Sequence, residues 1–198
     1  MEFQEVLARR RMVRNYLPNA VDDDALERII AAARKAPSAG FSQGQSMLVV
    51  RSESTRRAIA QLADEDEYVA DGFDPWISGA PVHVVVCASE AAYHDRYREA
   101  DKLDAEGSEI EWPIPYWWVD AGATMMLLLL AAVDEGSAAG FLGVNSIPGV
   151  RELPSIPAEV TPIGVVTIGH PAPDRRSGSL VRGWKPAAAV VHREEWQT

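Results

Sequence analysis

The sequence predicts an α+β fold in which a single mixed or antiparallel sheet is flanked by helices. Two observations indicate this class. Segments with helical periodicity alternate with fewer and shorter apolar runs of strand length. No G-x-G-x-x-G follows the first such run, so a dinucleotide-binding Rossmann fold is not indicated. With 198 residues, of which 47% are hydrophobic, we expect one domain over residues 1–198.

The amino-terminal part predicts two helices. The first should run from about residue 2 into an arginine run, because its apolar residues share one helical face. The second should occupy the stretch VDDDALERIIAAARKAP, residues 21–37. Asp24 and Glu27 have the spacing of a capping box, and Pro37 stops the helix.

The rest of the chain continues the alternation. Strands are expected at 46–51, 81–88, 141–144 and 161–169, helices at 54–63, from 90 and at 116–134, an acidic loop at 64–75, and a helical turn at 150–153. The tail, 171–198, is rich in Pro, Gly and Arg and should be extended. Because such a tail buries little by itself, it either wraps its own core or packs on a partner chain.

The helix expected at 116–134 is hydrophobic nearly all round, and its most apolar part is MMLLLLAAV at 125–133. A helix of this kind must be covered on every side. We therefore expect a homodimer with this long central helix at a symmetric interface. The alternative is a compact monomer whose sheet and remaining helices bury it.

Composition limits the partners and the compartment. The net charge of −10 argues against a nucleic-acid binder, because phosphate contacts dominate such affinity. The apolar run is far shorter than the roughly 20 residues of a membrane span, and no basic-then-apolar leader opens the sequence. We expect a cytoplasmic protein without a membrane segment. The single cysteine, Cys87, should be a small buried hydrophobe.

Basic residues concentrate near the amino terminus. Residues 1–60 hold ten Lys or Arg against seven Asp or Glu, whereas residues 61–120 hold three against fifteen. The run RRRMVRNY at 9–16 fits either a solvated helix end, which the helix dipole favours, or a clamp for a phosphate group. An acidic protein with such a run can bind one small anion.

The string GFSQG at 40–44 matches the G-x-S-x-G of serine hydrolases. A nucleophile elbow needs a strand before the serine and a helix after it, and the order here is reversed. A hydrolase that uses Ser42 with His83, His170 or His192 is therefore a remote alternative. Ser42 should instead be a loop residue that hydrogen-bonds the backbone.

Two motifs together carry a resemblance. RRMVRNY at 10–16, followed by APSAGFSQG at 36–44 and an apolar strand, resembles the opening of the FMN-dependent nitroreductase family, with its R-R-S-x-R-x-F/Y and A-P-S-x-x-N-S-Q-P-W. The similarity continues more weakly through DEG at 134–136, GVVTIGHP at 164–171 and RGWKP at 182–186. It therefore covers nearly the whole chain.

The resemblance implies a nitroreductase-like homodimer that binds FMN, takes hydride from NADH or NADPH, and passes it to a nitro compound, quinone or similar small acceptor by ping-pong turnover. Two alternatives share the fold: specialised flavin chemistry, such as dehalogenation or flavin destruction, and a flavin- or deazaflavin-binding protein without turnover. No catalytic dyad is expected, because the flavin carries the chemistry.

The resemblance also assigns cations. Arg10 matches the arginine that holds the FMN phosphate, Arg11 the adjacent basic or polar position, and Arg14 the cation near the pyrimidine edge of the flavin. Arg182 matches a tail cation that completes the phosphate site, and Lys185 is a weaker candidate for the same role.

The loop at 37–40 matches the family loop that comes from the second subunit and lies against the flavin; it consists of Pro37, Ser38, Ala39 and Gly40. Some positions depart from the family pattern. Met12 stands where a Ser hydroxyl often contacts the phosphate, Phe41 and Gly44 replace Asn and Pro, Gln45 replaces Trp, and Trp184 replaces Arg. Substrate preference therefore cannot be transferred from the family.

Aromatic residues gather in EWPIPYWWVD, as Trp112, Tyr116, Trp117 and Trp118. They could form a lid or substrate wall that Pro113 and Pro115 hold in place. Packing in the core or at a dimer interface is the alternative, since tryptophans dominate interface burial.

Overall fold

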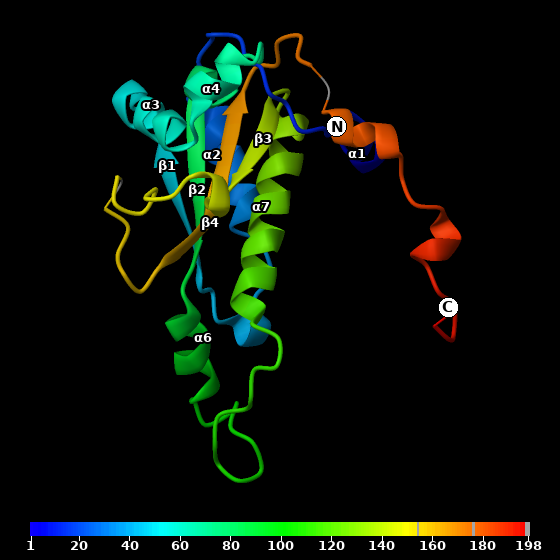
Figure 1. Ribbon diagram of the computed structural model, residues 1–198. Helices are drawn as coiled ribbons and strands as arrows, with labels where there is room; N and C mark the ends of the chain where they lie inside the picture. The colour runs from blue at the N-terminus through cyan, green and yellow to red at the C-terminus, as the bar shows by residue number, and fades with distance from the viewer. Residues whose placement is uncertain (154, 176, 197–198) are drawn as a thin grey trace.

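Four strands form one antiparallel sheet in the order β1-β2-β4-β3 in the computed structural model, which describes residues 1–153, 155–175 and 177–196 (Figure 1). The strands are β1 (Gln45–Val50), β2 (Val82–Ala88), β3 (Ala138–Gly143) and β4 (Thr161–Gly169). The α-helices are α1 (Phe3–Arg9), α2 (Asp23–Ala33), α3 (Glu53–Leu62), α4 (Glu65–Ala70), α5 (Trp76–Gly79), α6 (Glu90–Tyr97) and α7 (Tyr116–Asp134). The predicted α+β class with a single sheet is confirmed.

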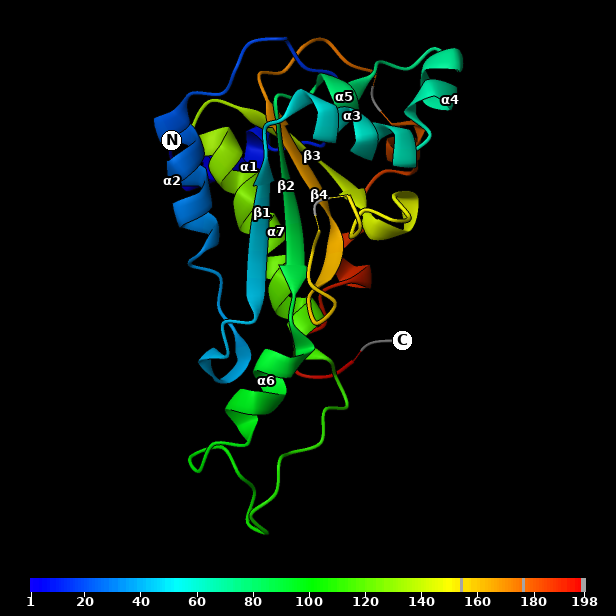
Figure 2. The same ribbon diagram turned by 90° about the vertical axis from the view of Figure 1, so that its left-hand side faces the viewer.

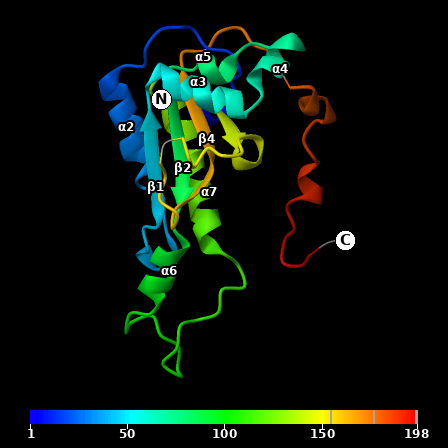
Figure 3. The same ribbon diagram turned by 60° about the vertical axis from the view of Figure 1, so that its left-hand side comes forward.

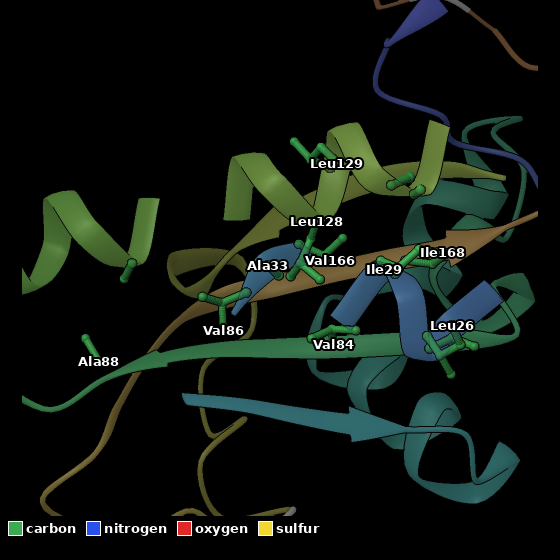
Figure 4. Packing of buried hydrophobic residues seen from close by; sticks show 14 of the residues in the cluster. Leu26, Ile29, Ala33, Val84, Val86, Ala88, Leu128, Leu129, Val166 and Ile168 are labelled. Carbon is green, nitrogen blue, oxygen red and sulfur yellow. The ribbon is translucent and has the colours of Figure 1, made fainter. Parts of the chain in front are cut away.

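Helices α2 and α7 cover one face of the sheet. Leu26, Ile29 and Ala33 of α2 pack with Leu128 of α7 against alternate residues of β2 and β4, as Figure 4 shows. Ile29 is fully buried. The apolar face of α2 therefore makes part of the main core.

Helices α3 and α5 cover the opposite face near one end of the sheet (Figure 2). Val85 and Cys87 of β2 pack there with Ile59 of α3 and Trp76 of α5. Because successive strand residues point to opposite faces, a strand covered on both sides is buried at every position, as all of β2 is. Cys87 is a small buried residue, as predicted, and burial raises the pKa of its thiol to about 11.

The first two helices differ in detail from the prediction. Helix α1 ends at Arg9, the first residue of the arginine run, with Arg10 as its C-cap, so the helix runs into that run as predicted, and Arg11 and Arg14 lie beyond it. Helix α2 is capped by Asp22, whose side chain accepts from the backbone N–H of Ala25, and not by Asp24. Asp22, Asp23 and Asp24 are consecutive residues of a type that caps helices, and the structure starts the helix after the first of them.

The acidic segment 64–75, expected as a loop, contains helix α4 and leads into α5. Glu65 is buried and accepts hydrogen bonds from the backbone N–H groups of Ile77 and Ser78, at 2.6 and 3.1 Å. These N–H groups open α5 and have no partners within the helix, so the carboxylate stabilises its start.

Strand β3 was predicted as 141–144 but begins at Ala138. Its first residues, Ala-Ala-Gly, have low strand propensity, so local preference gave no signal for them. Pairing with β4 makes them a strand: Ala138 lies opposite Gly169. Gly140 is required there, because a Cβ would lie 2.6 Å from the carbonyl oxygen of Val13.

Helix α7 has the predicted bounds and is long and apolar enough, by length and composition, to cross a membrane. It packs on the sheet and on α2, and it also contacts α1. Part of its surface remains apolar and accessible: Val119 and Met126 are 52% and 40% exposed.

Two segments project from this body. The irregular stretch 98–115 extends beyond α6 at one end of the sheet (Figures 1 and 2). We call residues 177–196 the arm; it stands away from the body and contains two short 3₁₀ turns (Figure 3). The tail prediction for 171–198 also includes residues 176, 197 and 198, which lie outside the described residues. The helical turn expected at 150–153 is a series of hydrogen-bonded turns.

Candidate functional site

Residues 10–16 form an extended segment beside one end of the sheet. Met12 makes a parallel bridge with Ala139 of β3, and Tyr16 makes an antiparallel bridge with Pro171, just beyond β4. Met12 packs against the core, where the family pattern has a hydroxyl. The Tyr16 hydroxyl is buried and hydrogen-bonds to β4, and burial raises its pKa. The backbone that carries the arginines is therefore fixed on both sides.

Asp174 pairs with one of the predicted phosphate-binding cations. Its Oδ1 accepts a hydrogen bond from Nη1 of Arg11 at 2.5 Å, and its Oδ2 accepts from the backbone N–H of Arg14 at 2.9 Å. The Asp174 side chain is only 5% exposed. Arg11 is thus neutralised within the chain.

Arg10 and Arg14 differ from Arg11. Neither side chain forms an ion pair or a side-chain hydrogen bond with any described residue, although both are half-buried. The Arg14 guanidinium lies 5.9 Å from the ring centroid of Trp76. A guanidinium held on an aromatic face without a carboxylate keeps its donors for a ligand.

A cavity of about 540 Å³ opens beside Arg14. Its lining combines aromatic rings, two guanidinium groups and one carboxylate, and consists of Arg14, Tyr68, Phe73, Asp74, Trp76, Arg175, Ser177 and Gly178. The Arg175 guanidinium lies 5.0 Å from the ring centroid of Phe73, so both arginines stack on aromatic rings. The size falls within the range of small-molecule and cofactor sites. The aromatic and tail residues of this cavity follow no sequence motif, and sequence analysis missed them.

The loop at 37–44 is tightly folded. Gly40, Phe41 and Gln43 all have positive φ, which favours glycine and strains the other two. Hydrogen bonds hold this shape: Ser38 Oγ accepts from the N–H of Gln43, and the N–H of Ala39 donates to Asp120 of α7, both at 2.9 Å. The loop therefore has fewer free N–H groups than its composition suggests.

The arginine segment and this loop lie at opposite ends of the sheet. The loop leads into Gln45, which pairs with Ala88 at the end where β4 begins, whereas the arginine segment borders the end where β4 finishes, at Gly169. Nine residues of β4 separate the two ends, which is roughly 27 Å of strand. One chain does not bring the two motifs together.

The tail cations are also separate. Arg182 and Lys185 lie on the arm and are exposed, and neither forms an ion pair or a side-chain hydrogen bond within the described chain. Figures 1 and 3 show the arm directed away from the sheet. Trp184 between them is 94% exposed.

The departures in the loop have physical reasons. A Cβ at Gly44 would lie 2.6 Å from Cε2 of Tyr93, so proline could not stand there. Gln45 donates from Nε2 to the carbonyl of Pro37 at 2.9 Å and closes the loop. Phe41 is 74% exposed and extends the loop surface.

Ser42 is a structural residue, as predicted: its hydroxyl donates to the carbonyl of Ala39 at 2.6 Å. Its loop precedes strand β1, so the geometry of a nucleophile elbow is absent from this part of the described chain. Among the described residues, no group of three His, Cys, Asp or Glu side chains could hold a metal ion.

The aromatic residues before and within α7 divide into two sets. Trp117 is buried and, with Trp112, packs around Tyr93 of α6, with ring centroids about 6 Å apart. Tyr116 and Trp118 are exposed. The first pair is core packing, and only the second is available to a ligand or a second subunit.

Comparison with known proteins agrees with this fold. The family model for the nitroreductase family matches residues 7–170. The FMN reductase [NAD(P)H] of Bacillus subtilis is 29% identical over 96% of the chain and 72% of its own length. The oxygen-insensitive NADPH nitroreductase of Salmonella typhimurium is 28% identical over 98% of the chain and 74% of its own length.

A solved structure, that of B. megaterium NfrA2, superposes with a TM-score of 0.76 at 25% identity and covers 100% of this chain and 76% of its own. The relatives are named as oxidoreductases, and the family match spans most of the chain. The protein belongs to the nitroreductase family of oxidoreductases.

Proposed function

We propose that this protein is an FMN-dependent oxidoreductase that moves hydride from NADH or NADPH to a nitro compound, quinone or similar small acceptor by ping-pong turnover. The observation that carries the proposal is the cavity beside Arg14. The guanidinium groups of Arg14 and Arg175, which line this cavity, stack on aromatic rings, and neither forms an ion pair with a described carboxylate. The names of the relatives support the same activity class.

The residues present fit FMN. A phosphate dianion needs cations that keep their charge, and Arg10 meets that need because no described carboxylate neutralises it. Arg14 would face the pyrimidine edge of the ring, where reduction adds negative charge. FMN, when bound, would accept and donate hydride at its own ring. The side chains of this chain bind and orient it and exclude water.

A homodimer completes the proposed site. The loop at 37–44 and the arginine segment are roughly 27 Å of strand apart in one chain, so the loop can face a flavin only in a second subunit. The exposed apolar face of α7 gives that subunit a surface to bind. The arm, which carries Arg182 and Lys185, would lie on the partner and bring these cations toward the phosphate. We place this dimer in the cytoplasm.

The absorption spectrum of the purified protein tests the proposal. We expect flavin absorption, release of FMN on heating, and anaerobic bleaching when NADH or NADPH is added. Protein that is colourless and fails to bind added FMN at micromolar concentration would contradict it. Protein that binds FMN but is not bleached by either nucleotide would be a flavin-binding protein without turnover.

A further inference from the structure

Asp120 is a buried carboxylate that joins three elements. It lies in α7, near the amino-terminal end, and is 6% exposed. Its Oδ2 accepts from the backbone N–H of Ala39 in the loop at 2.9 Å and from the hydroxyl of Tyr93 in α6 at 2.7 Å. Burying a carboxylate is costly unless such bonds compensate it, so this arrangement fixes the positions of all three elements together.

Helix α6 holds the other side of the same loop. Arg96 donates from Nε to the carbonyl of Gly40 at 3.0 Å, and the N–H of Ser89 donates to the carbonyl of Gly44 at 2.8 Å. The rings of Tyr93 and Tyr97 lie where the Cβ atoms of these two glycines would be. The contacts come from one face of α6, and the loop is pressed between that face and α7.

The aromatic cluster closes around the hydrogen bonds. Tyr93 is fully buried, and its ring contacts Trp112 and Trp117 edge-on. Burial, with the adjacent Asp120 carboxylate, raises the pKa of Tyr93, so its hydroxyl stays protonated and donates. Water is excluded from the bond between Tyr93 and Asp120, which strengthens it.

We propose that Asp120 is the positioning residue of the flavin-facing loop, and that with Tyr93 it couples the shape of that loop to the start of the interface helix α7. This inference rests on the proposed function, because it requires the loop to lie against the flavin of the second subunit. The carboxylate acts through the Ala39 N–H and need not touch the flavin.

The test compares Asp120→Ala, Asp120→Asn and Tyr93→Phe in the full-length FMN-loaded protein. Asp120→Ala should weaken FMN affinity about tenfold and alter the visible circular dichroism of the bound flavin, because the loop loses its anchor. Asp120→Asn keeps an acceptor oxygen for Ala39 and should restore the affinity to within about threefold of wild type. Tyr93→Phe should fall between the two.

Tyr97→Phe is the matched control, because Tyr97 lies on the same face of α6 but its hydroxyl makes no hydrogen bond within the described chain. It should leave affinity and dichroism near wild type. Failure of the wild type to bind FMN would refute the proposed function itself. Wild-type binding combined with unchanged affinity and dichroism in Asp120→Ala would overturn the role of Asp120 alone. If Asp120→Ala does not fold, equal behaviour of Tyr93→Phe and Tyr97→Phe overturns it.

Discussion

Four arginines near the amino terminus have different surroundings, and these surroundings separate their roles. Arg9 forms a surface pair with Glu5 one helical turn away, and Arg11 pairs with Asp174. Arg10 and Arg14 keep their donors. A motif gives residue types and spacing, but the partner of each charge decides which one is available to a ligand.

Replacing Arg10 should therefore affect cofactor binding more than replacing its neighbour. Arg10→Ala should weaken FMN binding by roughly 1.5 to 3 kcal/mol, because a charge-assisted hydrogen bond to the phosphate is lost. Arg9→Ala is the matched control and should weaken FMN binding by less than about 0.5 kcal/mol. Arg9 is engaged in an exposed ion pair with Glu5, and the loss of such a pair changes little. Fluorescence titration of FMN measures both. Equal losses in the two variants would contradict the assignment of Arg10.

His94 gives the protein a pH-dependent contact. Its Nδ1 hydrogen-bonds the Glu109 carboxylate, which also accepts from Trp112 Nε1 and pairs with Arg98, while Glu90 lies on the other side of the ring. The bond to Glu109 raises the pKa of His94, and the same bond lowers the pKa of Glu109. A raised histidine pKa stabilises the fold fully below its unfolded value of about 6.5, and this contribution is lost as pH rises through the folded pKa.

The wild type should therefore exceed His94→Gln in stability by more at about pH 5.5 than at about pH 8.5. His83, whose pKa burial lowers to about 4, acts in the opposite direction because it is held neutral. Its contribution is common to both proteins and cancels in the difference. Urea unfolding at the two pH values measures this, and a difference that grows with pH would refute the ion pair.

At the scale of the element, the residues of α2 that face the sheet should contribute more to the stability of the fold than those beside them. Ile29 is fully buried against β2 and β4 (Figure 4). Its neighbour Ile30 is only partly buried against the same cluster. Two identical side chains in one helix thus meet different packing. Helix propensity is the same for both, so any difference in their effect on stability must come from the tertiary contacts.

Ile29→Ala should lower the free energy of unfolding by about 2 to 5 kcal/mol, because it leaves a cavity in a closely packed core. Ile30→Ala removes the same atoms from a more exposed site and should cost clearly less. Denaturant unfolding of the two variants makes the comparison. If Ile30→Ala proved the more costly, the register of α2 on the sheet would be wrong.

At the scale of the whole molecule, one face of α7 and the arm both carry accessible apolar side chains. Val119 and Met126 are exposed on α7, and Val181 of the arm is 90% exposed. Exposed apolar side chains that share one helix face suit an interface with a second copy. The same second copy would cover α7, receive the arm, and supply the loop that the arginine segment lacks.

We expect light scattering to give about twice the 21.6 kDa mass of the chain. Met126→Glu should produce monomer and lose FMN together, because a charge would be buried in the interface. Leu103→Glu, at a similarly exposed position outside α7, should leave both unchanged. A wild-type monomer that binds FMN and oxidises NADPH would refute the shared site.

Much of the fold follows from the sequence alone. The apolar run at 81–88 predicts the strand observed as β2 (Val82–Ala88), and the long apolar stretch after Pro115 predicts a helix at 116–134, the observed bounds of α7. The resemblance to the nitroreductase family rests on two short motifs, at 10–16 and 36–44, each of which can be recognised from consecutive residues alone. These elements depend on residues close together in the sequence, so the hydrophobic pattern is enough to predict them.

Only the tertiary structure decided the remainder. Asp174 reaches Arg11 across 163 positions, and Asp120 reaches Ala39 across 81, so nothing local could indicate either pair. The first residues of β3 became a strand through pairing with β4 against their own propensity. The two motifs also lie at opposite ends of the sheet. The loop leads into β1 at the end where β4 starts, whereas the arginine segment lies beside the end where β4 finishes. The sequence motifs predict which residues belong to the site, whereas the direction of each strand determines which of those residues one chain can bring together.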